Sequence, residues 1–284
     1  MGIYPRVSDY VKSCLTCLKY NYENRKPAGL MKPHSYLGPW TEVSVDLIGP
    51  LPPSKDRNVY LLVIVDIFSG WVEAFPLRKS MADSKAIVEK LLSVFCRWGF
   101  PKTIISDNGP QFISKLWNAT MFKLGIQVKH TSPYNPQANP VERKNRDIKL
   151  YLSKFCGDNH KNWDENIQPM LFSLRTAVHR STGYTPARLL LGKELHGPLD
   201  ILLDHNMVNE SSIDFKNYAE KLAIQLRNAN IYALENRMIS GEIQKNYYDL
   251  GRREVKFEEG DLVLCRSHFQ SSAIKDFAAK LAPV

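Results

Sequence analysis

The ten residues Thr41-Glu42-Val43-Ser44-Val45-Asp46-Leu47-Ile48-Gly49-Pro50 open the best-patterned part of the chain. Val43, Val45 and Leu47 alternate with Ser44 and Asp46, which is the period of a β-strand with two different faces. Gly49-Pro50 then breaks the strand. The pattern predicts a strand over residues 41–48 that carries an acidic side chain inside a sheet.

The sequence on the C-terminal side of this strand predicts a mixed sheet. Residues 58–68 and 71–77 are apolar and β-branched, and a Ser69-Gly70 turn separates them, so three strands should form an antiparallel meander. Two short strands should follow, at 103–106 and 127–131. Helical spacing of apolar residues predicts helices over 80–98, 114–124, 141–155 and 163–179. This order is typical of an α/β domain with helices on the faces of a five-stranded sheet.

The chain should divide into four parts. Residues 1–37 are basic and rich in loops, and we expect the remnant of a small N-terminal module and a linker there; residues 38–200 should form the α/β domain. Over 201–250, apolar residues from Phe215 to Ala233 step by three and four, which predicts a long helical linker that leads away from the core. Residues 251–284 should begin a truncated small β module.

Composition favours a nucleic-acid partner. The chain has 284 residues, 44% of them hydrophobic, and a net charge of +9. A positive balance of this size suits an anionic partner, nucleic acid first, although a merely basic soluble protein has the same charge. No apolar run is long enough for a membrane span, and five scattered cysteines argue against a disulfide framework. We therefore expect an intracellular protein.

Three acidic residues stand where strands and helices begin or end. Asp46 lies in the first strand, Asp107 follows the fourth, and Glu142 opens a basic helix. Carboxylates at such positions can converge where a helix crosses the sheet, and they suit hard divalent cations such as Mg²⁺ or Mn²⁺. Two such cations can clamp an in-line phosphoryl displacement. Each residue taken alone is more typical of a turn or a helix cap than of a metal site.

Five longer sequence motifs resemble the catalytic core of retroviral and Ty3/gypsy-type integrases, and they occur in the expected order. They are VSVDLIGP (43–50), VDIFSGW (65–71), SDNGPQF (106–112), SPYNPQANPVER (132–143) and TPARLLLG (185–192). The resemblance implies an RNase H-like fold and assigns metal binding to Asp46, Asp107 and Glu142. It also implies an integrase that trims DNA 3′ ends and joins them to target DNA with two Mg²⁺ or Mn²⁺ ions. Such a protein would act on DNA in the nucleus, after a possible cytoplasmic stage, as a homo-oligomer.

Two other acidic residues compete for the third metal position. Asp107 and Glu142 enclose 34 residues, one fewer than the commonest family spacing, but the helix can start one residue earlier. The resemblance aligns Asp66 with a position that is not a ligand. Asp147 lies about 140° around the helix from Glu142, so both cannot easily face the same cations. We expect Asp66 and Asp147 to be structural or solvated.

The helix that starts at Glu142 also offers DNA-binding side chains. Asn145, Arg146 and Lys149 follow Glu142 by three, four and seven residues and share its face. Basic side chains there can bind phosphates near the metals, and the resemblance supports this role; a solvated face with ordinary ion pairs is the alternative. Tyr134 and Gln137 match positions where relatives contact the DNA end, and loop packing is their alternative role.

Cys14-x-x-Cys17 is half of a zinc site. The resemblance places the His pair of such a site upstream, before the first residue of this sequence. We therefore expect no closed zinc site in the chain, and we expect Cys96, Cys156 and Cys265 to be packing residues.

Two other functions compete with the integrase hypothesis. A metal nuclease of the same fold, such as a ribonuclease H, shares the acidic residues but lacks the words around Asp107 and Glu142. A non-catalytic DNA-binding protein descended from an integrase would bind DNA without joining it, and loss of a carboxylate would mark it. All three carboxylates are present.

Overall fold

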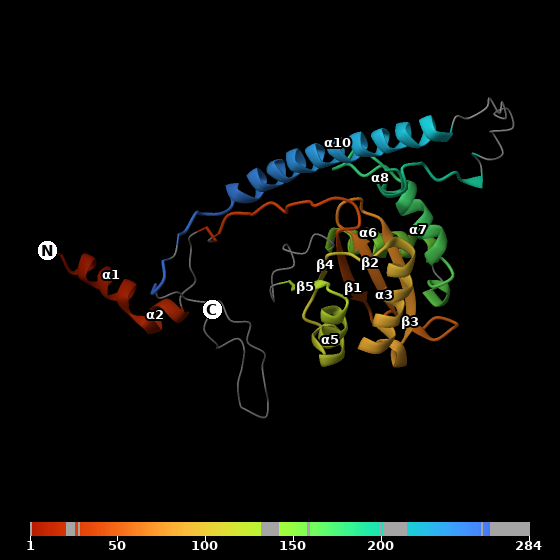
Figure 1. Ribbon diagram of the computed structural model, residues 1–284. Helices are drawn as coiled ribbons and strands as arrows, with labels where there is room; N and C mark the ends of the chain where they lie inside the picture. The colour runs from red at the N-terminus through yellow and green to blue at the C-terminus, as the bar shows by residue number, and fades with distance from the viewer. Residues whose placement is uncertain are drawn as a thin grey trace. The chain divides into compact units, whose positions relative to one another are not determined.

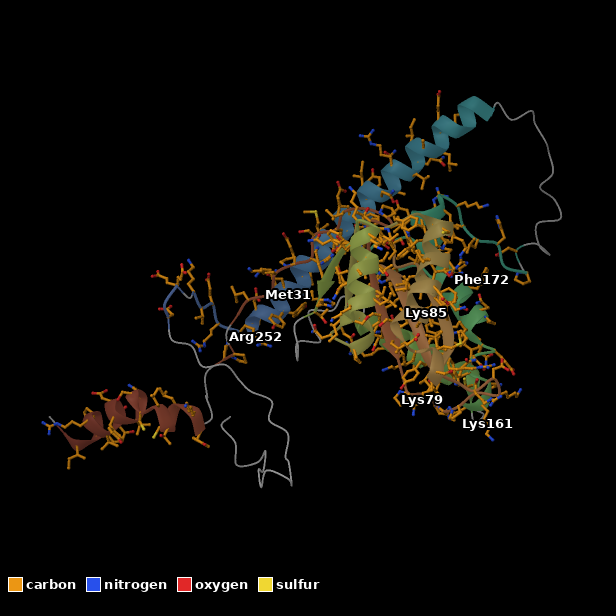
Figure 2. The ribbon with its side chains drawn as sticks, turned by 60° about the horizontal axis from the view of Figure 1, so that its bottom comes forward. Met31, Lys79, Lys85, Lys161, Phe172 and Arg252 are labelled. Carbon is orange, nitrogen blue, oxygen red and sulfur yellow. The ribbon has the colours of Figure 1, made fainter. Side chains whose placement is uncertain are left out.

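The computed structural model describes residues 2–20, 26–27, 29–131, 142–157, 160–198, 200, 215–256 and 258–261, with the backbone alone at 142–143 and 215–219. The chain forms two compact units. The larger comprises residues 33–242, and the smaller combines residues 1–32 with 243–284. In the larger unit, Lys79, Lys85 and Lys161 project from the surface (Figure 2).

A five-stranded sheet lies at the centre of the larger unit, in the order β3-β2-β1-β4-β5. Its strands are β1 (Glu42–Ile48), β2 (Asn58–Asp66), β3 (Val72–Arg78), β4 (Thr103–Ser106) and β5 (Gln127–His130). β2 pairs antiparallel with both β1 and β3, whereas β4 pairs parallel with β1 and β5. The predicted mixed sheet is confirmed, and the five predicted strands differ from these bounds by two residues at most.

Helices cover both faces of this sheet (Figure 1). They are α3 (Ser84–Trp98), α4 (Pro110–Ile113), α5 (Lys115–Lys123), α6 (Glu142–Cys156), α7 (Ile167–Thr176) and α8 (Pro186–Leu191), with short 3-10 turns η1 (Lys79–Met81) and η3 (His160–Asn162). One apolar cluster joins the sheet to α3 and α5, and a second joins it to α6 and α7. The helix predicted over 163–179 is shorter, because residues 163–166 form a turn instead.

The alternation in β1 divides its side chains between the two clusters. Val43 and Val45 belong to the cluster under α3 and α5, and Ile48 belongs to the cluster under α6 and α7. Successive side chains of a strand point to opposite faces, so Ser44 and Asp46 share the face of Ile48. Asp46 therefore points toward the side of the sheet on which α6 packs.

The long helix α10 (Phe215–Leu250) confirms the predicted C-terminal helix, but the expectation that it leads away from the core is wrong for its middle part. Ala229 and Ala233 are buried against Phe68 and Leu189. Small side chains let two elements approach closely, and a step of four residues suits packing within one chain as well as a coiled coil. The apolar stripe of α10 lies where the sequence predicts it, but it packs against the core of the same chain.

Polar contacts also attach α10 to the larger unit. Asn236 Nδ2 donates a hydrogen bond to the carbonyl of Thr182 at 3.0 Å. The Arg237 guanidinium lies over the ring of Tyr36, 4.7 Å from its centroid, and only 8% of Arg237 is exposed. This part of α10 is therefore a packed component of the larger unit.

The smaller unit contains α1 (Ile3–Ser13), α2 (Leu15–Tyr20) and the end of α10. Two hydrogen bonds join distant parts of the sequence in this unit: Gly29 N–H donates to the Arg253 carbonyl, and Met31 N–H donates to Asp249 Oδ1. Most of the predicted β module, residues 262–284, lies outside the described residues. No helix in the described part of the chain has the length and apolar character needed to cross a membrane.

Candidate active site

The strand pairing brings Asp46 and Asp107 together. β1 and β4 are parallel neighbours, and Ser44 is in register with Ile105. Asp46 lies two residues after Ser44, and Asp107 lies two residues after Ile105, so the two carboxylates stand at the same level of adjacent strands. Their charges interact, because Asp107 acts to raise the pKa of Asp46.

Asp46 is held in a partly buried, acidic environment. Burial is the largest cause that raises the pKa of Asp46, and Asp107 raises it further. The backbone N–H of Leu47, the Asn145 amide and the Lys149 charge act in the opposite direction, and the net shift is upward. A cation between the two side chains would stabilise the ionised form of Asp46, which burial and the charge of Asp107 disfavour. Asp46 and Asp107 together therefore have the character of a cation site.

Asp107 is oriented by a tight turn. Its Oδ1 accepts a hydrogen bond from Gly109 N–H at 2.9 Å, and Asn108 Nδ2 donates to the Thr131 carbonyl at 2.8 Å. A Cβ on Gly109 would lie 2.9 Å from Asp107 Oδ1 and 2.5 Å from Gln111 Nε2. A larger residue at this position would require the side chains of Gln111 and Asp107 to move, so Gly109 leaves room for the carboxylate in its present orientation.

α6 crosses the same face of the sheet and begins at Glu142. Ile148, Leu152 and Cys156 anchor it in the cluster beneath. Asn145 lies on the same stripe: only 7% of it is exposed, and its Nδ2 donates a hydrogen bond to Asp46 Oδ2. We predicted DNA contact for Asn145. That contact stays a prediction; in the structure the Asn145 side chain is buried against Asp46, where it orients the carboxylate.

One buried atom at the site has no partner. Among the described residues, none donates a hydrogen bond to Asn145 Oδ1, although a buried amide oxygen normally accepts one. This oxygen belongs to the same side chain that binds Asp46. A cation-bound water would supply the missing donor, so the orphaned atom agrees with a hydrated cation at this place.

Arg146 and Lys149 are both exposed on α6. Lys149 is close enough to Asp46 for its charge to lower the pKa of that carboxyl. Lys149 follows Asn145 by four residues, so the two side chains are neighbours on one helix face. The surface beside Asp46 therefore carries at least one positive charge that solvent can reach.

Three predicted positions cannot be placed on this site. Tyr134 and Gln137 lie outside the described residues, and the side chain of Glu142 does as well. Within the described ranges, no group of three His, Cys, Asp or Glu side chains stands close enough to bind a metal. The two described members of the predicted triad, Asp46 and Asp107, are adjacent.

Asp66 occupies a different place and has a structural environment. It is in register with Val43, three residues before Asp46 along β1. The fully buried carboxylate accepts hydrogen bonds from the backbone N–H groups of Trp40 and Ser69, at 3.0 and 2.9 Å, and from the Ser69 hydroxyl. Burial raises the pKa of Asp66, and these bonds oppose the shift. The hydrogen bonds of Asp66 therefore stabilise the β2–β3 turn.

Asp147 faces a neighbour on its own helix. Burial is the largest effect on the pKa of Lys144 and lowers it. The charge of Asp147 raises this pKa, the charge of Arg237 in α10 lowers it, and the net shift is downward. Asp147 is thus an electrostatic partner of Lys144, and Asp46 is not among the groups that it affects.

The role of Asn145 as a positioning residue was not predicted from the sequence. A polar side chain on the buried stripe of Ile148 and Leu152 was the available signal.

Residues 38–136 match the integrase core domain family. Residues 38–136 therefore carry the sequence of an integrase core domain. The match contains Asp46 and Asp107 and ends before Glu142. The predicted relationship to retroviral and retrotransposon integrases is thereby confirmed.

Relatives of this integrase core domain are retrotransposon polyproteins. The Tf2-3 and Tf2-4 polyproteins of the fission yeast Schizosaccharomyces pombe are each 28% identical over 269 residues. That similarity covers 93% of this chain and 19% of each polyprotein, so the chain spans about a fifth of their length.

A solved structure shows the same fold. A chain of the simian T-cell lymphotropic virus intasome, solved in complex with PP2A regulatory subunit B56 gamma, matches with a TM-score of 0.53 and 26% identity. The match covers 69% of this chain and 69% of that chain. The RNase H-like assignment of the integrase core domain is confirmed.

Proposed function

We propose that this chain is the DNA-joining part of an integrase, which trims the 3′ ends of element DNA and joins them to target DNA. The observation that carries the proposal is the pair Asp46–Asp107 at one level of parallel strands, beneath a helix that begins at Glu142. Within the integrase core domain, this arrangement suits Mg²⁺ or Mn²⁺ bound by three carboxylates.

The donor groups fit the implied cations. Asp46 and Asp107 supply hard oxygen ligands, which Mg²⁺ prefers, and Asn145 offers an oxygen nearby that has no partner in the described part of the chain. Two bound cations would supply Lewis-acid activation of the attacking oxygen and charge stabilisation of the leaving oxygen. We assign metal binding to Asp46, Asp107 and Glu142.

The protein's own side chains then orient and bind. Asn145 holds Asp46 in one rotamer through its hydrogen bond, so that the carboxylate is preorganised before DNA arrives. Arg146 and Lys149 bind phosphates on the outer face of α6, where both are exposed. The net charge of +9 strengthens attraction to DNA over the rest of the surface. Trimming uses water as nucleophile, and joining uses the new 3′-hydroxyl.

Assembly and location follow from the same proposal. The viral relative is solved as an intasome, which supports DNA and further copies of this chain as partners. Joining to chromosomal DNA requires entry into the nucleus.

The test is a strand-joining reaction with Mg²⁺, a labelled element end and supercoiled target DNA. Wild type should join the end to the target, and Glu142→Gln should bind the same DNA but join it at a rate at least 100-fold lower, on the order expected when a catalytic electrostatic contact is removed. Wild-type protein that binds DNA tightly but neither trims nor joins it would favour the non-catalytic DNA-binding alternative. Hydrolysis without joining would favour a nuclease.

A further inference from the structure

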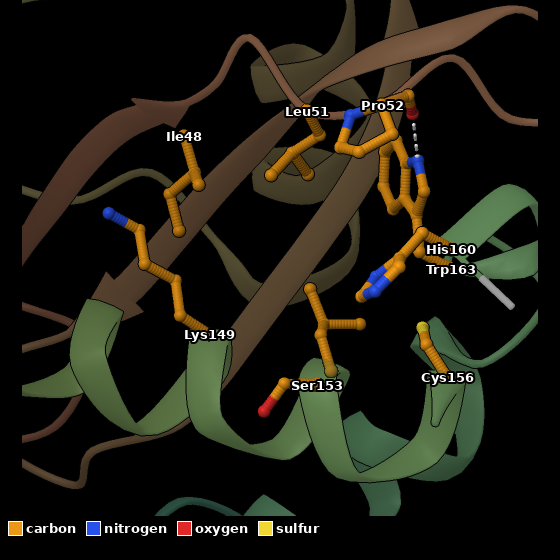
Figure 3. A pocket seen from close by; sticks show the side chains of 9 residues that line it. Ile48, Leu51, Pro52, Lys149, Ser153, Cys156, His160 and Trp163 are labelled. Atoms are coloured by element: carbon orange, nitrogen blue, oxygen red, sulfur yellow. Dashed lines mark hydrogen bonds between the residues drawn. The ribbon is translucent and has the colours of Figure 1, made fainter. Parts of the chain in front are cut away.

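A pocket opens next to the candidate active site, between the end of β1 and the C-terminal half of α6 (Figure 3). Its volume is about 130 Å³. The lining residues are mainly apolar: Ile48, Leu51, Pro52, Lys149, Leu152, Ser153, Cys156, His160 and Trp163. A cavity of about 150 Å³ with apolar walls holds benzene, so this pocket has room for roughly one ring.

The walls of the pocket are fixed before any ligand binds. Trp163 Nε1–H donates to the Pro52 carbonyl at 2.8 Å, and Asn58 Nδ2 donates to Asp164 Oδ2 at 2.8 Å. Lys55 N–H donates to the carbonyl of residue 161 at 2.9 Å. These bonds join the β1–β2 loop and the first residue of β2 to residues 161–164, so occupying the pocket requires little ordering of the protein.

The polar atoms of the lining are largely used inside the protein. The indole N–H of Trp163 is paired with Pro52, and the Ser153 hydroxyl donates to the Leu150 carbonyl at 2.9 Å. The ligand therefore meets apolar walls, with two polar side chains at opposite ends: Lys149 beside Ile48, and His160 beside Trp163 (Figure 3). Such a lining suits a flat ring that carries an anionic group on one side.

Lys149 connects this pocket to the candidate active site. Its charge acts on Asp46, and its side chain also lines the pocket. Ile48 follows Asp46 by two residues on the same face of β1, so the pocket begins about 7 Å along the strand from Asp46. A phosphate bound to Lys149 would thus lie close to the phosphate at the metals, with the pocket beside it.

We propose that this pocket receives one base of the element DNA end, unpaired from its partner, while Lys149 binds the phosphate of the same nucleotide. The assignment rests on the proposed function, because it places that nucleotide beside the reacting end. Unpairing costs least where a base is already near an end. Apolar contact with the walls replaces the stacking that the base loses, and His160 can hydrogen-bond its edge. The contact would fix the register of the DNA end over Asp46 and Asp107.

The test combines a pocket-filling variant with DNA ends that lack single bases. Ser153→Phe adds a ring at the rim of the pocket, which residue 153 lines, and keeps Lys149. Ser93→Phe is the matched control, because Ser93 is also exposed in mid-helix and also donates to the carbonyl three residues back, on the other face of the sheet. Binding is measured in Mg²⁺ or Ca²⁺ for intact ends and for ends with one abasic nucleotide at each of the terminal positions.

Ser153→Phe should weaken binding of the intact end by about 10-fold, the order of one lost base contact. One abasic position should weaken wild-type binding by a similar factor and should add nothing in Ser153→Phe, a coupling that the Ser93→Phe control does not show. Equal effects of Ser153→Phe on all ends would overturn the assignment, as would binding as tight as that of the control. Wild type that shows no preference for element ends would instead sink the proposed function, and this assignment with it.

Discussion

Asp66→Ala should destabilise the larger unit strongly, whereas Asp46→Ala should not. Removal of Asp66 leaves the buried N–H groups of Trp40 and Ser69 without acceptors. Each orphaned donor costs about 1–3 kcal/mol, so the loss is about 2–6 kcal/mol. Part of this destabilisation is offset, because the variant no longer buries a carboxylate. The raised pKa of Asp66 shows that burial disfavours its charged form. We expect a net destabilisation of about 2–4 kcal/mol.

Asp46→Ala is the matched comparison. It removes the repulsion between the carboxylates of Asp46 and Asp107. The relief of this repulsion offsets the loss of the hydrogen bonds from Leu47 N–H and Asn145. Its stability should stay within about 1 kcal/mol of wild type. Urea unfolding followed by tryptophan fluorescence measures both variants, since Trp40, Trp71, Trp98, Trp117 and Trp163 all belong to residues 33–242. Asp46→Ala should abolish Mg²⁺ binding, and Asp66→Ala should keep it. The reasoning fails if Asp46→Ala proves the more destabilising of the two.

Three further predictions concern helix α6 and the buried carboxylates. Replacing Arg146 and Lys149 by Ala should lower the slope of log binding constant against log salt by about 0.9 per lost phosphate contact, and an unchanged slope would contradict their role in DNA binding. Asn145→Ala should reduce Mn²⁺ affinity about 10- to 100-fold, measured by calorimetry, while Asn145→Ser should lose less; equal affinity in all three proteins would contradict its positioning role. Without metal, the unfolding free energy should fall as pH rises from about 4 through the raised pKa values of Asp46 and Asp66. The reason is that the folded state binds more protons than the unfolded state in this range. The fall should be smaller in Asp46→Asn.

The sheet was predictable because each strand carries its own local signal. The alternation of Val43, Ser44 and Val45 fixes which side chains share a face, and the turn at Ser69-Gly70 fixes the hairpin after it. Strand order is not a local property, and nothing in the periodicity says that β4 lies beside β1. The proximity of Asp46 and Asp107 was therefore predicted through the resemblance to integrases, and the parallel pairing supplies its physical cause.

Features that depend on contacts between distant segments were not predictable. Asn145 looked like one of several polar residues on a basic helix face, and its burial follows from how α6 lies on the sheet. The docking of α10 depends on close contacts: a Cβ on Gly192 would lie 2.9 Å from Leu226. The pocket needs the β1–β2 loop and residue Trp163 together, and 111 positions separate the two bonded residues in the chain.

The central claim is that Asp46 and Asp107, with Glu142, hold the divalent cations that drive DNA joining. Crystals of the chain grown with Mn²⁺ and a DNA end, measured at the manganese absorption edge, test this claim directly. The account predicts anomalous density in contact with the carboxylates of Asp46, Asp107 and Glu142, and its loss in Asp107→Asn crystals grown in the same way. Manganese bound elsewhere, or density at this place that persists in Asp107→Asn, would contradict it.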